Sequence, residues 1–259
     1  VVTFWSHPRN VLQNDARNLR LLTSMEEKKK LLTDIGIDKV EVIPFSREFS
    51  RLTTEDYLRD YVIAKFGGKA VLVGYDNRIG SDLCTPEQTA GIAEKLGLEV
   101  IRPMSYKTDN GIVISSTKIR NALSEGNIDE ANAMLGYPYQ LYGVVVSGNR
   151  LGHTIGFPTA NMQLYEPLKL VPGNGVYLVK VETLGRQLDG MCNIGVRPTL
   201  GSGNALTIET NIFDFDEDIY GLDIRLSFVK KIRNEVKFND LALLTSQLDK
   251  DRELCRSLL

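Results

Sequence analysis

Hydrophobic positions divide the chain into two parts with different periodicities. In residues 1–136, apolar runs of strand length alternate with segments whose apolar residues follow a helical spacing. The apolar runs read VVTFW, KVEVIPF, AVLVGYD and LEVIRPM, and the helical segments read SMEEKKKLLTDIG, TTEDYLRDYVIAKFGG, TPEQTAGIAEKLG, SSTKIRNALSEG and NIDEANAMLG. Such alternation is typical of a parallel sheet with right-handed crossovers. AVLVGYD is almost wholly apolar, so we expect this strand to be buried on both faces.

After Pro138 the pattern changes to apolar runs separated by Gly, Asn and Asp turns. These runs read YQLYGVVVSG, GVYLVKVETL, RQLDGMCNIG, ALTIETNIF and DIRLSFVKKI. They predict an antiparallel sheet or small barrel. Leucines at helical spacing predict one final helix over roughly residues 238–258. We therefore expect two domains, an α/β domain over residues 1–137 and an all-β domain with a terminal helix over residues 138–259.

Charge and cysteine usage narrow the possible partners. The chain carries 31 Lys and Arg against 33 Asp and Glu, a near-neutral balance that disfavours broad binding to a nucleic-acid backbone. Its three cysteines are far apart and it has two histidines, so a structural zinc site is not expected. No apolar run approaches the ~20 residues of a membrane span. We expect a cytoplasmic monomer or weak oligomer that binds neither nucleic acid nor membrane.

A hydroxyl-rich segment follows an apolar run near the end of the first part. In GIVISSTKIR, Ser115, Ser116 and Thr117 precede a helical segment that carries Lys118 and Arg120. Free backbone N–H groups at a helix start, together with hydroxyls and a cation, suit a phosphate group. The alternative is that Ser116 or Thr117 only caps the helix, and the local residues favour neither interpretation.

Asp76 ends the apolar run VGYD. Because ligands bind at the carboxyl ends of strands in open parallel sheets, Asp76 is a candidate contact to a ligand, although an Asp that caps a loop is as common. The sequence contains neither Gly-x-x-x-x-Gly-Lys-[Ser/Thr] nor a Gly-x-Gly-x-x-Gly fingerprint after a strand. The usual P-loop and dinucleotide sites are therefore not predicted.

The segment GHTIGFPTAN offers candidate oxygen ligands for a cation. Pro158 fixes the backbone before Thr159, and Asn161 lies two residues further on, on the same side of an extended chain. Their oxygens can converge on Mg²⁺, which accepts a few protein ligands and leaves its other positions to water and phosphate. Three glycines allow a bulky anion to approach the backbone, namely Gly148, Gly152 and Gly156. By itself this segment favours the simpler interpretation of turn glycines and a buried Pro-Thr pair.

Glu209 lies within the strand-like run LTIETNIFDF. A carboxylate there points either to solvent or into a site, where it could act as general base toward a substrate hydroxyl. A surface glutamate is the commoner case. The segment CNIGVRPT adds a polar loop with Asn193, Arg197 and Thr199.

Taken together, these motifs resemble a known pair of domains. GFPTAN, NIGVRPT and IETNIFDFDEDIYG, in this order and spacing, resemble the riboflavin kinase domain over the whole second part. FWSHPR, VGYD and ISSTKIR resemble the FMN adenylyltransferase domain of bacterial two-domain FAD synthetases. The resemblance implies a Rossmann-like nucleotidyltransferase domain followed by a small antiparallel β-barrel.

The resemblance also implies roles for the candidate residues. Thr159 and Asn161 would hold Mg²⁺ and the ATP phosphates, beside the three glycines, and Glu209 would take the proton from the terminal ribityl hydroxyl of riboflavin. The segment with Asn193, Arg197 and Thr199 would close over the flavin together with the final helix. In the first domain, the ATP phosphates would be bound by Ser115, Ser116, Thr117 and Arg120. Asp76 would contact the nucleotide or the flavin.

The sequence departs from the family pattern at several positions. The family's first domain opens with a strand and a Gly-x-Phe-Asp-Gly-x-His-x-Gly-His motif, and this sequence contains neither. We expect the missing segment to exist in the parent protein, because a parallel sheet without a central strand exposes apolar surface. Asn77 and Ile79 stand where the family usually has Phe, and His153 stands where Arg or Lys is commoner.

The expected function is synthesis of flavin cofactors from riboflavin, FMN and ATP. Riboflavin and ATP would give FMN and ADP, and FMN with a second ATP would give FAD and pyrophosphate. One alternative is a riboflavin kinase whose first domain has no catalytic role. Another is a non-enzymatic nucleic-acid-binding protein, since small barrels also bind oligonucleotides, although the neutral charge disfavours it.

Overall fold

The chain folds into two compact units. The first comprises Val1–Leu19 and Met25–Val113, and the second comprises Arg20–Ser24 and Ile114–Leu259. The structure, a computed structural model, describes residues 1–5, 7–13, 19–75, 77–104, 106–108, 111, 113–148, 151–199 and 203–259. The two helical segments before Pro138 therefore belong to the same compact unit as the residues that follow it. The functional boundary between residues 137 and 138 stays a prediction.

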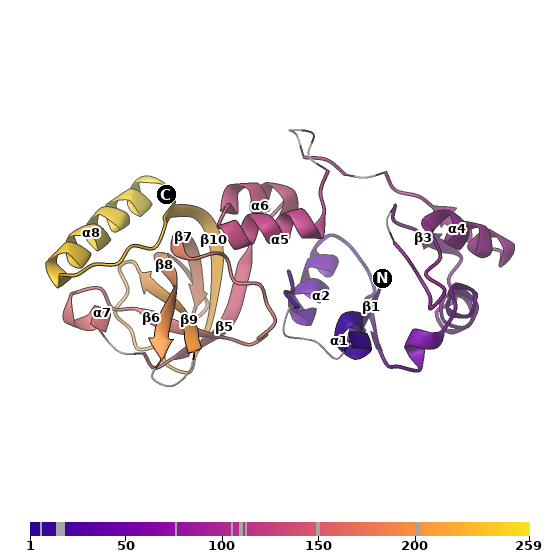
Figure 1. Ribbon diagram of the computed structural model, residues 1–259, viewed down its shortest axis with the longest axis horizontal. Coiled ribbons are helices and arrows are strands. Elements are labelled where there is room, and N and C mark those ends of the chain that lie inside the picture. Colours follow the sequence, from indigo (N-terminus) through magenta and orange to yellow (C-terminus); the bar gives the residue numbers. More distant parts are fainter. Residues whose placement is uncertain are drawn as a thin grey trace. The chain divides into compact units, whose positions relative to one another are not determined.

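The first unit contains short parallel strands and the helices between them (Figure 1). Its elements are β1 (Val2–Trp5), α1 (Pro8–Gln13), α2 (Met25–Asp34), β2 (Glu41–Pro44), the 3₁₀ turn η1 (Phe49–Arg51), α3 (Thr54–Asp56), the π-helical segment η2 (Tyr57–Lys65), β3 (Ala70–Leu72), α4 (Pro86–Lys95) and β4 (Glu99–Ile101). β1 pairs with β2 and β3 pairs with β4, both in parallel. The predicted α/β class with parallel strands is confirmed.

The prediction that the third apolar run is buried on both faces is wrong. Within β3, the side chain of Leu72 is 60% exposed. Among the described residues β3 pairs only with β4, and β1 pairs only with β2, so two separate two-stranded sheets replace the single sheet that was expected. Among the described residues, β4 covers one edge of β3 and no strand covers the other. Much of this apolar strand therefore contacts solvent, which explains why the prediction of full burial fails. The further strand expected in the parent protein stays a prediction.

Side-chain caps fix the starts of α3 and α4. Thr85 accepts a hydrogen bond from the backbone N–H of Gln88, and the Gln88 side chain accepts one from the Thr85 N–H, which forms a capping box at the start of α4. Pro86 occupies the first turn, as its sequence position predicts. Leu58, Ala93 and Leu98 form the buried centre on which these helices pack. Local sequence signals therefore account for these elements.

The second unit is built around a closed six-stranded antiparallel barrel (Figure 1). Its strands are β5 (Gln140–Val146), β6 (Ala160–Leu164), β7 (Gly175–Thr183), β8 (Arg186–Thr199), β9 (Gly203–Ile212) and β10 (Asp223–Arg233). They pair in the order β10-β5-β6-β9-β8-β7, and β7 pairs with β10 to close the barrel. The predicted small barrel is confirmed. Alternation sends Cys192, Ile194 and Ile208 into the buried core, and the residues between them point outward.

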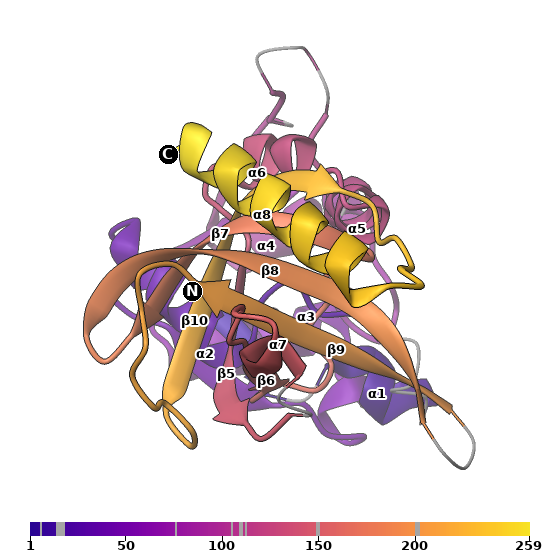
Figure 2. The same ribbon diagram turned by 90° about the vertical axis from the view of Figure 1, so that its left-hand side faces the viewer.

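In the described part of the chain, four helices complete the second unit. They are α5 (Ser116–Glu125), α6 (Ile128–Leu135), α7 (Leu151–Thr154) and α8 (Leu241–Ser257). α5 and α6 share the main core with the barrel strands through Ile119, Leu123 and Ile128. The predicted terminal helix is α8, which crosses the outside of the barrel and packs on β8 and β10 (Figure 2). A second apolar cluster, which includes Met191, lies on this side of the barrel.

A short segment from early in the chain also belongs to the second unit. Leu21 forms an isolated parallel bridge with Lys169, and Leu170 donates a backbone hydrogen bond of 2.8 Å to the Leu21 carbonyl. The buried Lys169 ammonium donates to the Leu22 carbonyl at 2.8 Å and lies 4.5 Å from the Tyr139 ring centroid. The barrel unit is therefore discontinuous in the sequence.

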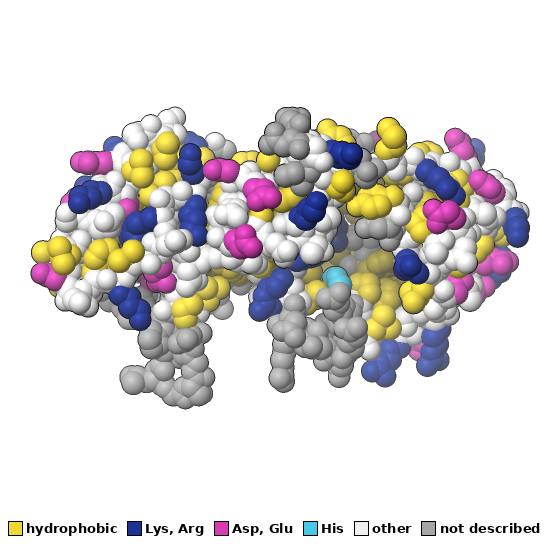
Figure 3. All heavy atoms as spheres, turned by 45° about the horizontal axis from the view of Figure 1, so that its top comes forward, with side chains coloured by type: hydrophobic (Ala, Val, Ile, Leu, Met, Phe, Trp, Pro, Cys, Tyr) yellow, Lys and Arg dark blue, Asp and Glu magenta, His cyan; other side chains and the backbone are white. Residues whose placement is uncertain are grey.

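Charged side chains of both signs are interspersed on the surface. On the face drawn in Figure 3, the described Lys and Arg side chains alternate with Asp and Glu and form no continuous basic stripe. This distribution agrees with the near-neutral composition. A search of the described helices finds none with the length and apolar character needed to cross a bilayer.

Candidate active site

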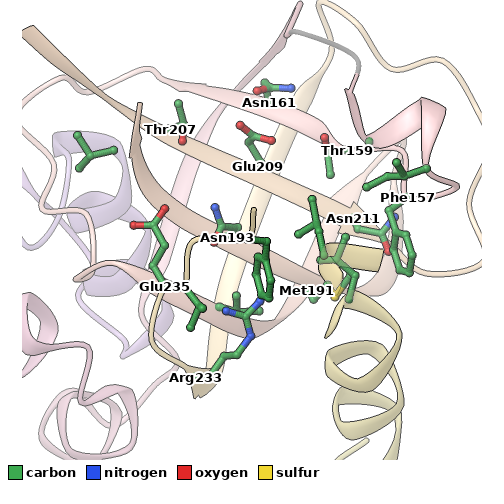
Figure 4. Close-up of a pocket in the computed structure, with 18 residues that line it drawn as sticks. Phe157, Thr159, Asn161, Met191, Asn193, Thr207, Glu209, Asn211, Arg233 and Glu235 are labelled. Carbon is green, nitrogen blue, oxygen red and sulfur yellow. The ribbon is translucent and has the colours of Figure 1, made fainter. Parts of the chain in front are cut away.

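A cavity of about 320 Å³ lies between the outer face of the barrel and helix α8. Its lining combines polar side chains from β6, β8 and β9 with apolar side chains from the α7 region, β7, β8 and α8 (Figure 4). The polar residues are Thr159, Asn161, Asn193, Thr207, Glu209, Asn211, Arg233 and Glu235, and the larger apolar ones include Phe157, Met191, Phe238, Leu244 and Leu248. A cavity of this size with a few convergent polar groups is typical of a small-molecule site.

Glu209 lies in the middle of a row of three polar side chains on neighbouring strands. On β9 it pairs directly with Asn161 of β6 on one side and with Asn193 of β8 on the other. Directly opposed residues have Cβ atoms about 4.5–5.5 Å apart and point to the same face of the sheet. The fold therefore places one carboxylate between two amides, and all three side chains line the cavity.

The Pro158–Thr159 segment is held beside this row by a hydrogen bond from the same strand as Glu209. Asn211 Nδ2 donates to the Pro158 carbonyl oxygen at 2.7 Å. Thr159 then lines both the first cavity and a second one next to it. Thr159, Asn161 and Glu209 thus line the same cavity.

Glycines make room for these side chains. A Cβ atom at Gly148 would lie 2.2 Å from Nδ2 of Asn161. A Cβ atom at Gly152 would lie 2.1 Å from the Phe157 carbonyl oxygen and 3.4 Å from Oγ1 of Thr159. Gly156 has a φ of +77°, a conformation that favours glycine. These glycines therefore define the position of the neighbouring side chains as well as the course of the turn.

The predicted polar loop with Asn193, Arg197 and Thr199 is not a loop. All three residues belong to β8, which forms a long hairpin with β9 and pairs as far as Thr199 opposite Gly203. The prediction of a loop is wrong because backbone pairing with β9 overrides the Gly and Pro signals in this segment. Asn193 lines the cavity, whereas the side chains of Arg197 and Thr199 lie outside the described part of the structure.

The second cavity has a volume of about 650 Å³ and meets the first at Thr159. Its lining includes Val145, Pro158, Ile212 and Phe215, followed by the acidic segment 216–218. Two adjoining cavities that share one lining residue can hold two reactants next to each other.

The candidate phosphate site before α5 has a defined helix start. Ser115 is the N-cap residue, and its side chain accepts a hydrogen bond of 3.3 Å from the Lys118 N–H. Ser116 and Thr117 occupy the exposed first turn. The Nε atom of Arg120 donates to the Arg20 carbonyl at 2.9 Å. Asp76 lies outside the described residues.

The sequence reasoning missed several residues of the first cavity. Asn211 and Thr207 could have been found, because each lies two positions from Glu209 on the same strand and therefore shares its face. Arg233 ends β10 and Glu235 lies two residues beyond it, where the apolar periodicity stops and indicates no direction for a side chain.

A buried ion pair holds α8 against the barrel at the edge of the first cavity. Arg233 Nη2 lies 2.7 Å from Oδ2 of Asp251, and the side chains are 19% and 3% exposed. Arg233 Nε also donates to the same carboxylate, which accepts a further hydrogen bond of 2.8 Å from Gln247. The third guanidinium nitrogen donates to the Asn234 carbonyl. All three guanidinium nitrogens of Arg233 are therefore engaged, two of them with the carboxylate of α8.

The cavity offers no cysteine nucleophile among its described lining residues. Cys192 precedes Asn193 but points into the barrel core, where burial raises the pKa of its thiol to about 12. The chemistry available in the cavity is therefore that of carboxylate, amide and hydroxyl groups. Such oxygen donors suit Mg²⁺, and the described residues contain no cluster of three His, Cys, Asp or Glu that would form an all-protein metal site.

Comparison with known proteins identifies the class of each part. Residues 135–259 match the sequence model of the family described as riboflavin kinase, and residues 1–118 match the one described as FAD synthetase. The barrel with its row of polar side chains is thus a domain of the riboflavin kinase type, and it is combined with an α/β domain of the FAD synthetase type.

Relatives that match nearly the whole chain are named for both activities. The bifunctional riboflavin kinase/FMN adenylyltransferase of Bacillus subtilis is 36% identical over 98% of this chain and 80% of its own length. The enzyme of the same name from Escherichia coli K12 is 36% identical, over 99% of this chain and 81% of its own length. The chain belongs to the family of bifunctional riboflavin kinase/FMN adenylyltransferases, and the resemblance seen in the sequence is confirmed.

A solved structure shows the same fold. A crystal structure described as a macrolide-efflux protein from Streptococcus pneumoniae superimposes with a TM-score of 0.90 and 33% sequence identity, over 99% of this chain and 82% of that one. The arrangement of elements is therefore shared over almost the full length of both chains.

Proposed function

We propose that the barrel unit transfers the γ-phosphoryl group of ATP to riboflavin, which gives FMN and ADP. The observation that carries this proposal is the row of Asn161, Glu209 and Asn193 beside Thr159, at the point where two cavities meet. Riboflavin would occupy the first cavity, with its ring on the apolar side chains under α8, and ATP would occupy the second. The terminal ribityl hydroxyl and the γ-phosphate would then meet near Glu209.

Each polar residue then has a role that follows from its position. Glu209 accepts the proton of the terminal hydroxyl as its oxygen attacks the γ-phosphorus, and ADP leaves. Asn161 and Asn193 flank Glu209 and fix the position of its carboxylate and of the substrate hydroxyl. Thr159 and Asn161 would hold Mg²⁺, which when bound would neutralise the negative charge of the ATP phosphates. Pro158, held by Asn211, keeps the Thr159 hydroxyl in place.

For the second activity we propose that FMN and a second ATP react to give FAD and pyrophosphate. The support is the match of residues 1–118 to the FAD synthetase family and the exposed helix start at Ser116 and Thr117. The N–H groups of this first turn would bind ATP phosphates, with Ser115 as the cap and Arg120 next to it. Asp76 would contact nucleotide or flavin. The functional boundary would lie between residues 137 and 138, and the enzyme would act in the cytoplasm as a monomer or weak oligomer.

The test is an assay of the purified protein with riboflavin, ATP and Mg²⁺, with products separated by chromatography. FMN and then FAD are expected, and excess EDTA should abolish formation of FMN because the ATP phosphates lose their counter-charge. FMN without FAD would support the alternative of a kinase with a non-catalytic first domain. Formation of neither product would refute the proposed function.

Gly148→Ala is expected to lower kcat/KM for phosphorylation of riboflavin by roughly 10²-fold. The new methyl group would displace the Asn161 side chain, and a misplacement on the order of 1 Å costs about that factor. Steady-state kinetics at varied ATP and riboflavin would measure the change. Gly91→Ala on α4 is the matched control, since a Cβ atom there meets nothing within 4 Å. Equal activity of both variants would remove Gly148 from the site.

A further inference from the structure

The segment between β10 and α8 contributes a second carboxylate to the first cavity. Glu235 lies two residues beyond the end of β10 and is among the lining residues, together with Val236 and Phe238. Arg233, the last residue of β10, is fixed to Asp251 of α8. This segment therefore leaves the barrel at a defined point and in a defined direction.

Contacts on both oxygens define where the Glu235 carboxylate lies. Its Oε2 accepts a hydrogen bond of 3.2 Å from Asn174 Nδ2. Its Oε1 occupies the space above Gly195, where a Cβ atom at that glycine would lie 2.3 Å away. The carboxylate thus fills the position that a side chain at residue 195 would take on the cavity face of β8.

The strand register relates this carboxylate to the proposed general base. Gly195 pairs with Thr207, and the neighbouring pair on the same face is Asn193 with Glu209. Two residues along a strand correspond to about 7 Å. Glu235 therefore lies about one such step from Glu209, with Asn193 between them and Thr207 alongside (Figure 4). That spacing is comparable with the length of a short polyol chain.

The lining of the cavity on the side of α8 is largely apolar. Phe157 and Met191 lie away from Glu235 and Glu209 and toward α8 (Figure 4), and α8 adds Leu248 to the lining. A substrate with a flat apolar ring and a polyhydroxylated chain would place the ring there and the chain along the polar group. Ionised carboxylates only accept hydrogen bonds, and hydroxyl groups are donors that match them.

We propose that Glu235 is a specificity-determining residue that accepts hydrogen bonds from the secondary hydroxyls of the ribityl chain, while Glu209 acts on the terminal hydroxyl. This inference rests on the proposed riboflavin kinase activity. It assigns Asn174 and Gly195 as positioning residues, because the first orients the carboxylate and the second leaves space for it.

The test compares riboflavin with a flavin that carries a 5-hydroxypentyl chain, which keeps the terminal hydroxyl and lacks the secondary ones. In the wild type, kcat/KM should be higher for riboflavin. Glu235→Ala should reduce this preference about 10-fold, mainly through KM for riboflavin, since a hydrogen bond to a charged group is lost. Glu235→Gln keeps the size of the side chain, and its preference for riboflavin should lie between those of the wild type and Glu235→Ala. Gly195→Ala should reduce the preference in the same way by displacing the carboxylate.

Glu253→Gln, on the exposed side of α8, is the matched control and should leave the preference unchanged. An equal loss of kcat/KM for both flavins in Glu235→Ala and Glu235→Gln would overturn the proposal, because it would show a purely structural role. An unchanged preference in these variants would overturn it as well. If the wild type phosphorylates neither flavin, the proposed function itself fails, and this outcome is distinct from the other two.

Discussion

Glu209→Gln is expected to lower kcat for phosphorylation of riboflavin by about 10²- to 10⁴-fold, the usual contribution of a positioned general base. Glutamine has the same shape and keeps one acceptor oxygen, so it should still fit between Asn161 and Asn193. It cannot take up the proton of the attacking hydroxyl. KM for riboflavin should therefore remain close to the wild-type value, while the chemical step slows.

Rapid-quench measurement of single-turnover FMN formation would isolate this step from product release. Glu253→Gln again serves as the control, because it removes an exposed carboxylate of α8 at a distance from the polar row. A kcat within a factor of about two of the wild type would exclude Glu209 as the base. A large rise in KM at unchanged kcat would instead assign it to binding.

Asp251→Asn is expected to destabilise the barrel unit by about 3–5 kcal/mol, the typical effect of removing one partner from a buried ion pair. Asp251 is almost fully buried and accepts hydrogen bonds from Arg233 and Gln247. The substitution leaves the guanidinium, whose side chain is 19% exposed, without its counter-charge. Helix α8 should then detach more readily from β10.

Chemical denaturation followed by hydrogen–deuterium exchange on peptides of β7–β10 would measure this change separately from the first unit. The double variant Arg233→Met with Asp251→Leu should be less destabilised than Asp251→Asn, because apolar residues of similar size remove both charges together. If Asp251→Asn lowers the free energy of unfolding by less than about 1 kcal/mol, the pair behaves like a surface ion pair. Lys30→Gln, which breaks the exposed pair with Asp34, is the comparison for that case.

The sequence predicted the barrel and the α/β class because both depend on local periodicity. The strand pattern of residues 140–146 and 175–183, with alternating or continuous apolar positions, is sufficient to assign these strands. The terminal helix was expected over about residues 238–258 and is observed as Leu241–Ser257. Its N-cap Asp240, which accepts a hydrogen bond from the Ala242 N–H, explains the later start.

The features that the sequence did not predict depend on contacts between distant segments. Alternation along β9 shows that Thr207, Glu209 and Asn211 share a face, but it does not show that α8 covers this face and creates a cavity. The position of Glu235 depends on Gly195, forty residues earlier in the chain, and on Asn174. The long pairing of β8 with β9 likewise overrides local turn signals between Asn193 and Thr199.

The path of Arg20–Ser24 affects how this enzyme can be dissected. A fragment that begins at residue 114 or 138 would lack Leu21 and Leu22, so the Lys169 ammonium would lose a carbonyl acceptor in a buried position. The barrel therefore cannot be excised whole by a single cut in the gene. A circular permutant or a co-expressed peptide that supplies residues 20–24 would be the appropriate design for studying the kinase by itself.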